Sequence, residues 1–154
     1  MTDAAAHMIS PARPALLALL TSLLLSACVS PAWDDHDYAL KAGKTAESAV
    51  SAVRFARSAV AYRERMTGPY AEVLLTEAVQ DLSSVNDQFG GVQPPSDASD
   101  RIRDEVLRLT EKAESEVEDL LMQARRDGVK DPTTAVRVLD RLASELSDFA
   151  EKHR

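Results

Sequence analysis

The sequence predicts an all-α fold, an antiparallel four-helix bundle that follows an N-terminal signal segment. From residue 38 onward, apolar side chains recur at alternating spacings of three and four residues, which is the period of one helix face. Glycine and proline interrupt this pattern near residues 68, 91 and 128 and so divide it into four segments. No segment shows the period-two alternation of a half-buried strand. Four amphipathic helices joined by loops are typical of a bundle.

The first helix is expected over residues 38–65. Its apolar positions are almost all small, so a partner helix could approach it closely. They are Ala39, Ala42, Ala46, Ala49, Val53, Ala56 and Val60. Gly43 lies within the same segment, where glycine costs about 1 kcal/mol relative to alanine. It therefore marks either a close helix contact or a frayed helix start.

The second helix is expected over residues 69–89. Gly68 suits the end of the first helix, and Pro69 suits the first turn of the second. A connection this short predicts that the two helices form an antiparallel hairpin. The apolar positions of the second helix follow the same period. They are Ala71, Leu75, Ala78, Leu82, Val85 and Phe89.

Charge suggests how this hairpin pairs. The first helix carries six bases, whereas the second has four acids and no base (Glu72, Glu77, Asp81 and Asp87). An antiparallel arrangement predicts that Arg63 lies near Glu72 and Arg54 near Asp81. The alternative interpretation is that the acidic helix receives a basic partner.

The remaining segments predict a long loop and two more helices. Residues 90–99 contain two glycines and two prolines and are expected to cross between the hairpins. The third helix is expected over 99–127, after a serine cap, and Gly128 suits its end. The fourth is expected over 132–152, with Asp131 as its cap and Pro132 in its first turn. Their apolar positions complete the predicted core. They are Ile102, Val106, Leu109, Ala113, Val117, Leu120, Ala124, Ala135, Leu139, Leu142, Leu146 and Phe149.

The N-terminal segment has the layout of a secretory signal. Residues 1–13 are polar and contain one base, Arg13, while residues 15–25 are a dense apolar run. The run to residue 29 is shorter than the roughly 20 residues that a membrane-spanning helix needs. Either Met1 or Met8 is the start of the chain. The run ends in Leu25-Ser26-Ala27-Cys28, which contains the only cysteine of the sequence.

This four-residue ending resembles the lipobox of bacterial lipoprotein precursors, and the resemblance covers about the first thirty residues. It implies cleavage between Ala27 and Cys28, a diacylglyceryl group on the Cys28 thiol and an acyl chain on the new amine. Two or three acyl chains anchor a protein stably. By the same resemblance Val29, which is not aspartate, implies the outer membrane in a two-membrane bacterium. In a one-membrane bacterium, it implies the outer face of the cell membrane.

On this interpretation the chain divides into a signal peptide over 1–27, a lipidated acidic tether over 28–37, and the bundle over 38–154. Trp33 lies in the tether, where it has two open interpretations. Its side chain either reaches the lipid headgroups, where tryptophan is favoured, or packs on the end of the bundle. Asp34, Asp35, His36 and Asp37 are weak candidates for a metal site. Adjacent residues converge poorly on one ion, so an acidic helix start is the preferred interpretation.

Composition and motifs exclude several function classes. The chain has 25 acidic and 18 basic side chains, and the signal segment holds one of each, so the net charge of −7 stays with the rest. An acidic protein is a poor candidate for nucleic-acid binding. We find no serine elbow, phosphate-binding glycine loop or zinc-binding histidine pair. We therefore expect no enzyme and no cofactor beyond the covalent lipid.

The leading hypothesis is a lipid-anchored extracytoplasmic helical bundle that supports or contacts another envelope protein without catalysis. The alternative is a membrane-anchored module that binds a small apolar ligand or a metal ion. A lipid anchor also concentrates copies in two dimensions, which favours weak self-association through a small-residue helix face. The simpler interpretation of that face is the core of this bundle. The sequence identifies no residue that binds a partner.

Overall fold

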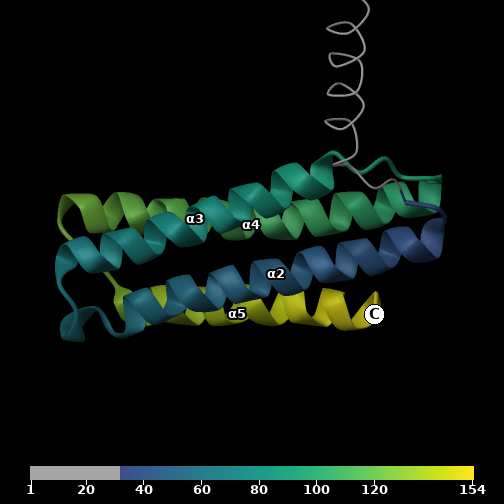
Figure 1. The fold of residues 1–154 in the computed structure, drawn as a ribbon. Coiled ribbons are helices and arrows are strands. Elements are labelled where there is room, and N and C mark those ends of the chain that lie inside the picture. Colours follow the sequence, from purple (N-terminus) through teal and green to yellow (C-terminus); the bar gives the residue numbers. More distant parts are fainter. Residues whose placement is uncertain (1–31) are drawn as a thin grey trace, which may run out of the picture. The chain divides into compact units, whose positions relative to one another are not determined.

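The computed structural model describes residues 32–154, and these residues form four long α-helices and one short 3₁₀ helix. The long helices are α2 (Asp35–Ala61), α3 (Gly68–Gly90), α4 (Asp97–Arg126) and α5 (Pro132–Lys152), and η2 (Arg63–Arg65) follows α2. They pack side by side, each antiparallel to the next (Figure 1). The predicted all-α four-helix bundle is therefore confirmed. None of these helices is both long enough and apolar enough to cross a membrane.

Helix α2 begins three residues earlier than expected, so the last part of the predicted tether is helical. Asp34 is the N-cap, and its Oδ1 accepts a hydrogen bond of 2.8 Å from the backbone amide of Asp37. The carboxylates of Asp35 and Asp37 lie in the first turn, where they complement the positive end of the helix dipole. The acidic helix start is thus what the structure shows.

The turn between α2 and α3 is longer than the sequence suggests. Helix α2 ends at Ala61, and the expected last turn becomes the 3₁₀ helix η2, a common way for an α-helix to tighten at its end. Gly68 is the first residue of α3 rather than the end of the first helix, and Pro69 lies in the first turn as predicted.

The loop between α3 and α4 is only Gly91–Ser96, because both helices extend into the expected loop. Ser96, not a later serine, caps α4 by accepting hydrogen bonds from the amides of Ala98 and Ser99. Arg103 donates a hydrogen bond of 2.9 Å to the carbonyl of Gly90, which satisfies the end of α3. These contacts hold the two helices side by side.

The connection between α4 and α5 matches the expectation. Gly128 adopts a φ of 85°, the left-handed conformation that favours glycine after a helix. The Asp131 side chain accepts a hydrogen bond of 3.0 Å from the amide of Thr134, and Pro132 opens α5. That amide holds the pKa of Asp131 below its usual range.

The most extensive helix contacts differ from the predicted hairpins. Helix α2 packs most against α5, and α3 packs most against α4, and Figure 1 shows these as a lower and an upper pair. Helix α2 also contacts α3 and, across the bundle, α4. Its small residues permit this central position, because a helix that touches three neighbours has room only for short side chains. Ala42, Ala46, Ala49, Val53, Ala56 and Val60 are buried as predicted, and Ala39 is partly buried.

The predicted salt bridges within the first hairpin are wrong. Arg63 pairs with its neighbour Glu64, and Arg54 has no ion pair with Asp81. The inter-helix pairs of the described residues instead join α5 and the residues after it to α2 and α4. They are Arg57–Asp140 at 2.9 Å, Lys112–Glu145 at 2.9 Å, Lys152–Glu105 at 3.4 Å and Arg154–Glu47 at 3.1 Å. Charge complementarity predicted that the bases of α2 pair with acids of α3. In the structure, Arg57 of α2 instead pairs with Asp140 of α5.

Candidate functional site

The strongest sequence-predicted site lies outside the described residues. Ala27 and Cys28, the proposed cleavage and lipidation positions, precede residue 32. The structure therefore leaves that prediction as it stands. Six residues separate Cys28 from Asp35, the first residue of α2.

Asp35 joins the start of α2 to the start of α4. Its Oδ1 accepts hydrogen bonds from the hydroxyls of Ser96, at 2.5 Å, and Ser99, at 2.7 Å. Ser99 is fully buried, so this bond satisfies a polar group inside the bundle. The two serine hydroxyls, Ser96 first, hold the pKa of the Asp35 carboxyl below its usual range. The contact is structural, and it joins the start of α2 to the start of α4.

The other members of the acidic cluster also have structural partners. Asp34 caps α2, while Asp37 pairs with Lys41 at 3.0 Å and accepts from the Trp33 amide at 3.1 Å. Lys41 and, to a lesser extent, the Trp33 amide lower the pKa of Asp37. His36 is exposed. Among residues 32–154, no three His, Cys, Asp or Glu side chains come together as metal ligands would.

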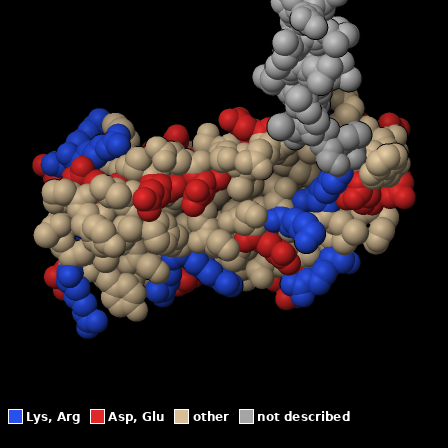
Figure 2. Space-filling view, in the orientation of Figure 1, with Lys and Arg blue, Asp and Glu red and all other residues tan. Residues whose placement is uncertain are grey.

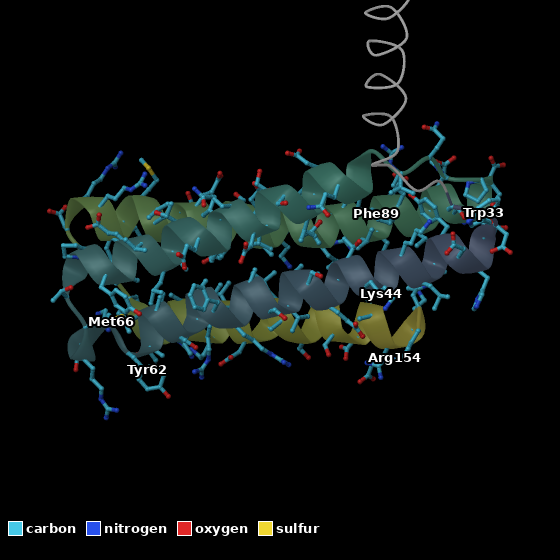
Figure 3. All side chains as sticks on the ribbon, viewed as in Figure 1. Trp33, Lys44, Tyr62, Met66, Phe89 and Arg154 are labelled. Carbon is cyan, nitrogen blue, oxygen red and sulfur yellow. The ribbon has the colours of Figure 1, made fainter. Side chains whose placement is uncertain are left out.

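The end of the bundle at which α2 begins also exposes the only tryptophan of the chain. Trp33 is 86% exposed, so the interpretation in which it packs on the end of the bundle is wrong. In Figure 3, Trp33 and Phe89 lie at one end of the bundle, with Tyr62 and Met66 at the other. Phe89 is buried against the ring of Tyr38, with ring centroids 5.2 Å apart. This end thus combines a closed core with one exposed aromatic side chain.

The helix interfaces contain buried polar side chains as well as apolar ones. Thr110 of α4 is fully buried and donates a hydrogen bond to the Asn86 side chain of α3. Asn86 in turn donates to Glu114 at 2.5 Å, and Glu114 is half-buried. Thr110 also lies within hydrogen-bond distance of the Val106 carbonyl. The three side chains form a satisfied polar network between α3 and α4.

A small apolar pocket lies at the end of the bundle remote from Trp33. It has a volume of about 240 Å³ and opens between the end of α2, the start of α3 and the end of α4. Arg63 and Glu64 flank it, and most other lining residues are apolar or glycine. They are Ala59, Val60, Gly68, Ala71, Leu75, Ala124, Gly128 and Val129. Its size and lining would suit a small apolar molecule.

A shallow groove of about 600 Å³ runs between α2 and α3. We call it the α2/α3 groove, and it is lined by both apolar and acidic side chains. The lining residues are Ser48, Ser51, Ala52 and Phe55 of α2, and Glu77, Asp81, Ser84, Val85 and Gln88 of α3. Figure 2 shows acidic and basic side chains dispersed over the visible face, with uncharged surface between them. Helices α2 and α3 lie on the near side in this view, and the two charged residues that line the groove, Glu77 and Asp81, are both acidic.

Two polar contacts of the bundle, those of Asp35 and Thr110, were not predicted from the sequence, for different reasons. The Asp35–Ser99 contact joins residues 64 positions apart, and no local pattern encodes that distance. Thr110 could have been found, because it sits in the apolar stripe of α4 directly after Leu109. The acidic character of the α2/α3 groove could be predicted from the sequence, because the second helix carries acids and no base.

Comparison of the chain with protein-family models, with curated protein sequences and with solved structures found no match.

Proposed function

We propose that this protein is a lipid-anchored extracytoplasmic helical bundle that binds another envelope protein without catalysis. The observation that carries the proposal is the lipobox-like Leu25-Ser26-Ala27-Cys28, followed within seven residues by a capped helix of a well-packed bundle. A signal segment with this ending directs export and acylation in the lipoproteins that it resembles. The short spacer would leave the bundle close to the membrane surface.

Trp33 supports an orientation in which α2 begins near the bilayer. Its exposed side chain lies five residues after Cys28, where the headgroup region would be within reach. The opposite end of the bundle, with η2 and the start of α3, would then point away from the membrane. The long sides of the bundle, including the α2/α3 groove, would be accessible to a neighbouring protein.

Photocrosslinking in living cells tests the binding role and the anchor together. A photoreactive residue is placed in turn at exposed positions around the bundle, in the wild-type chain and in the Cys28→Ala variant. We expect crosslinks to another envelope protein to cluster on one face, and to weaken in Cys28→Ala because the anchor no longer concentrates the protein at the membrane. Absence of crosslinks at every position would contradict the binding role. Membrane association that persists in Cys28→Ala would contradict the lipid anchor.

The apolar pocket between α2, α3 and α4 favours a second candidate function, the binding of a small apolar ligand. Its lining offers an apolar floor beneath the Arg63–Glu64 pair. A naphthyl dye whose fluorescence rises in apolar surroundings tests this candidate. We expect saturable binding that Ala71→Leu abolishes by filling the pocket, while Ala61→Leu, at an exposed position outside it, leaves binding intact. Equal binding by both variants would contradict a ligand site here.

A further inference from the structure

We propose that the α2/α3 groove receives a basic amphipathic helix of the envelope partner. This inference names the chemistry of the partner and so rests on the proposed binding role, although it does not require the lipid anchor. Three observations on the described residues support it. The acids of the groove have no ion pairs, its uncharged polar side chains are hydrogen-bonded within their own helices, and its floor includes an exposed aromatic side chain.

Helix α3 carries the unpaired acids. It has four acidic residues and no base, and within residues 32–154 none of these carboxylates takes part in an ion pair. None of the bases of α2 is among the residues that line the groove. Arg57 pairs with Asp140 of α5, and Arg54 lines a separate depression between α2 and α5. Glu77 and Asp81 therefore face the groove without cations, although the rest of the bundle pairs several of its charges.

The uncharged polar groups of the groove already have partners. The hydroxyls of Ser48 and Ser51 donate to carbonyls of their own helix, at 3.1 and 3.2 Å, and the Gln88 amide donates to Ser84 at 2.8 Å. Covering these groups would cost little, because their hydrogen bonds do not depend on water. The carboxylates of Glu77 and Asp81 differ, since neither has a hydrogen-bond partner among the described side chains. A covering segment must therefore supply cationic donors to them.

The floor of the groove is apolar and of helical dimensions. Phe55 is 38% exposed although it lies between two packed helices, and Ala52 and Val85 adjoin it. The lining residues of α3 extend over three turns, from Glu77 to Gln88, which corresponds to about 16 Å of helix axis. Short serine and alanine side chains on α2 leave room for a third helix backbone. An amphipathic helix of about 11 residues would fill this length, with apolar anchors over Phe55 and bases over α3.

A second copy of this chain fits the groove less well. Each of the other long helices carries both bases and acids, and the whole chain has a net charge of −7. Two copies would therefore bring further carboxylates toward Glu77 and Asp81. A partner with an excess of lysine or arginine on one helix face meets the charge of the groove, which is why we assign the occupant to another protein.

Peptide binding to the full chain in mild detergent tests the inference. The probe is a fluorescein-labelled synthetic helix of about 14 residues, somewhat longer than the groove, with lysines flanking a leucine stripe. A matched peptide has glutamate in place of every lysine. We expect saturable binding of the lysine peptide, weakened by added salt, and no binding of the glutamate peptide.

Two pairs of variants locate the binding. Glu77→Gln with Asp81→Asn removes two charges from the groove, whereas Glu72→Gln with Asp87→Asn removes the same two charges from α3 outside it. We expect the first double variant to weaken binding about fivefold or more and the second less than about twofold, from the usual energies of ion pairs. Likewise, Phe55→Ala should weaken binding, and Tyr70→Ala, at an exposed aromatic outside the groove, should not. Circular dichroism confirms that each variant is folded.

Several results would overturn the inference. They are absence of binding by the wild-type chain, equal losses in both double variants, and equal binding of the two peptides. Self-association that Phe55→Ala abolishes would also overturn it, because the occupant would then be a second copy. Cys28→Ala should bind the lysine peptide as the wild type does. Failure of the anchor and failure of the groove are therefore distinguishable.

Discussion

Gly43 fixes how closely α2 and α5 approach. A Cβ atom at this position would lie 2.7 Å from the backbone oxygen of His153, which is closer than a real contact allows. Of the two interpretations that the sequence left open, the structure shows the close helix contact. Glycine at position 43 lowers the intrinsic stability of the helix, because it is the poorest helix former after proline, but it permits a tight interface.

We therefore predict that Gly43→Ala destabilises the bundle by about 1–2 kcal/mol, the usual cost of overpacking, although alanine favours the helix. Gly68→Ala is the matched control, since nothing lies within 4 Å of its added Cβ, and it should be neutral or stabilising. Urea unfolding of both variants measures the two changes in free energy. Stabilisation by Gly43→Ala would mean that the last turn of α5 moves aside without cost.

Tyr38 is fully buried, and its hydroxyl has no hydrogen-bond partner among the described residues. Burial raises the pKa of this hydroxyl above its ordinary value, so it stays neutral and uncompensated. We predict that Tyr38→Phe stabilises the protein by about 1 kcal/mol, because it keeps the ring contact with Phe89 and removes an unsatisfied polar group. Chemical unfolding measures the change. A loss of stability would show that the hydroxyl has a partner in solution.

His153 makes the stability of the C-terminal end depend on pH. Its ring packs on Phe149, with centroids 4.4 Å apart, and its Nε2 atom is buried without a hydrogen-bond partner among residues 32–154. Burial, and then the nearby Lys152, lower its pKa below 6.5. As the pH falls, the unfolded chain therefore binds the proton first. The stabilisation is complete above pH 6.5 and is lost as the pH falls through the folded-state pKa.

The prediction is that the unfolding free energy falls below pH 6.5 in the wild type and that His153→Phe removes this part of the pH dependence. Asp35, Asp37 and Asp131 do not interfere, because their lowered pKa values place their losses below pH 3.8. Urea midpoints measured across this range provide the comparison. Identical pH profiles for the two proteins would contradict the burial of the His153 ring.

At the scale of the helix, the Thr110–Asn86–Glu114 network sets the register of α3 against α4. Thr110→Val keeps the shape of the side chain but leaves the Asn86 carbonyl oxygen without its donor. We predict a loss of about 1–2 kcal/mol, the usual cost of stranding a buried polar group. Thr110→Val with Asn86→Leu should cost less than the sum of the two single losses, although Glu114 then lacks its Asn86 donor. A double-mutant cycle by urea unfolding measures the coupling, and additive losses would contradict a shared network.

Sequence reasoning worked best where the deciding physics is local. The capping of α5 by Asp131, the turn at Gly128 and the buried stripe of small residues on α2 all depend on neighbours within one or two helical turns. Helix starts were less accurate, because Asp34 and Ser96 compete with nearby serine and aspartate residues as caps. Helix pairing could not be read from charge, because Arg57 lies beside α5 and its partner is 83 residues away.

At the scale of the whole molecule, charges are distributed unevenly around the bundle. The inter-helix ion pairs of the described residues all involve α5 or Arg154, which follows it, whereas the acids of α3 have none. Exposed ion pairs contribute about 0–1 kcal/mol each, so this arrangement contributes little to stability. Its consequence is that the acids of α3 are left without an ion pair among the described residues. Recognition of a basic partner is a use that fits these acids.

The small residues on one face of α2, which suggested self-association, pack against the other helices of the bundle. Ala46, Ala49 and Val53 are fully buried in the core. A second copy would therefore have to bind through another surface. The sequence could predict that the stripe is a helix contact, but not which helix covers it, because α2 has three neighbours.

The attachment of this bundle to a membrane is the central claim, and it depends on Cys28. Intact mass of the membrane-extracted protein, measured for the wild type beside Cys28→Ala, tests it most directly. We predict a wild-type chain that begins at Cys28 and carries two or three acyl chains, and a variant that carries none. An unmodified wild-type mass, or a chain that retains residues 1–27, would contradict lipid anchoring.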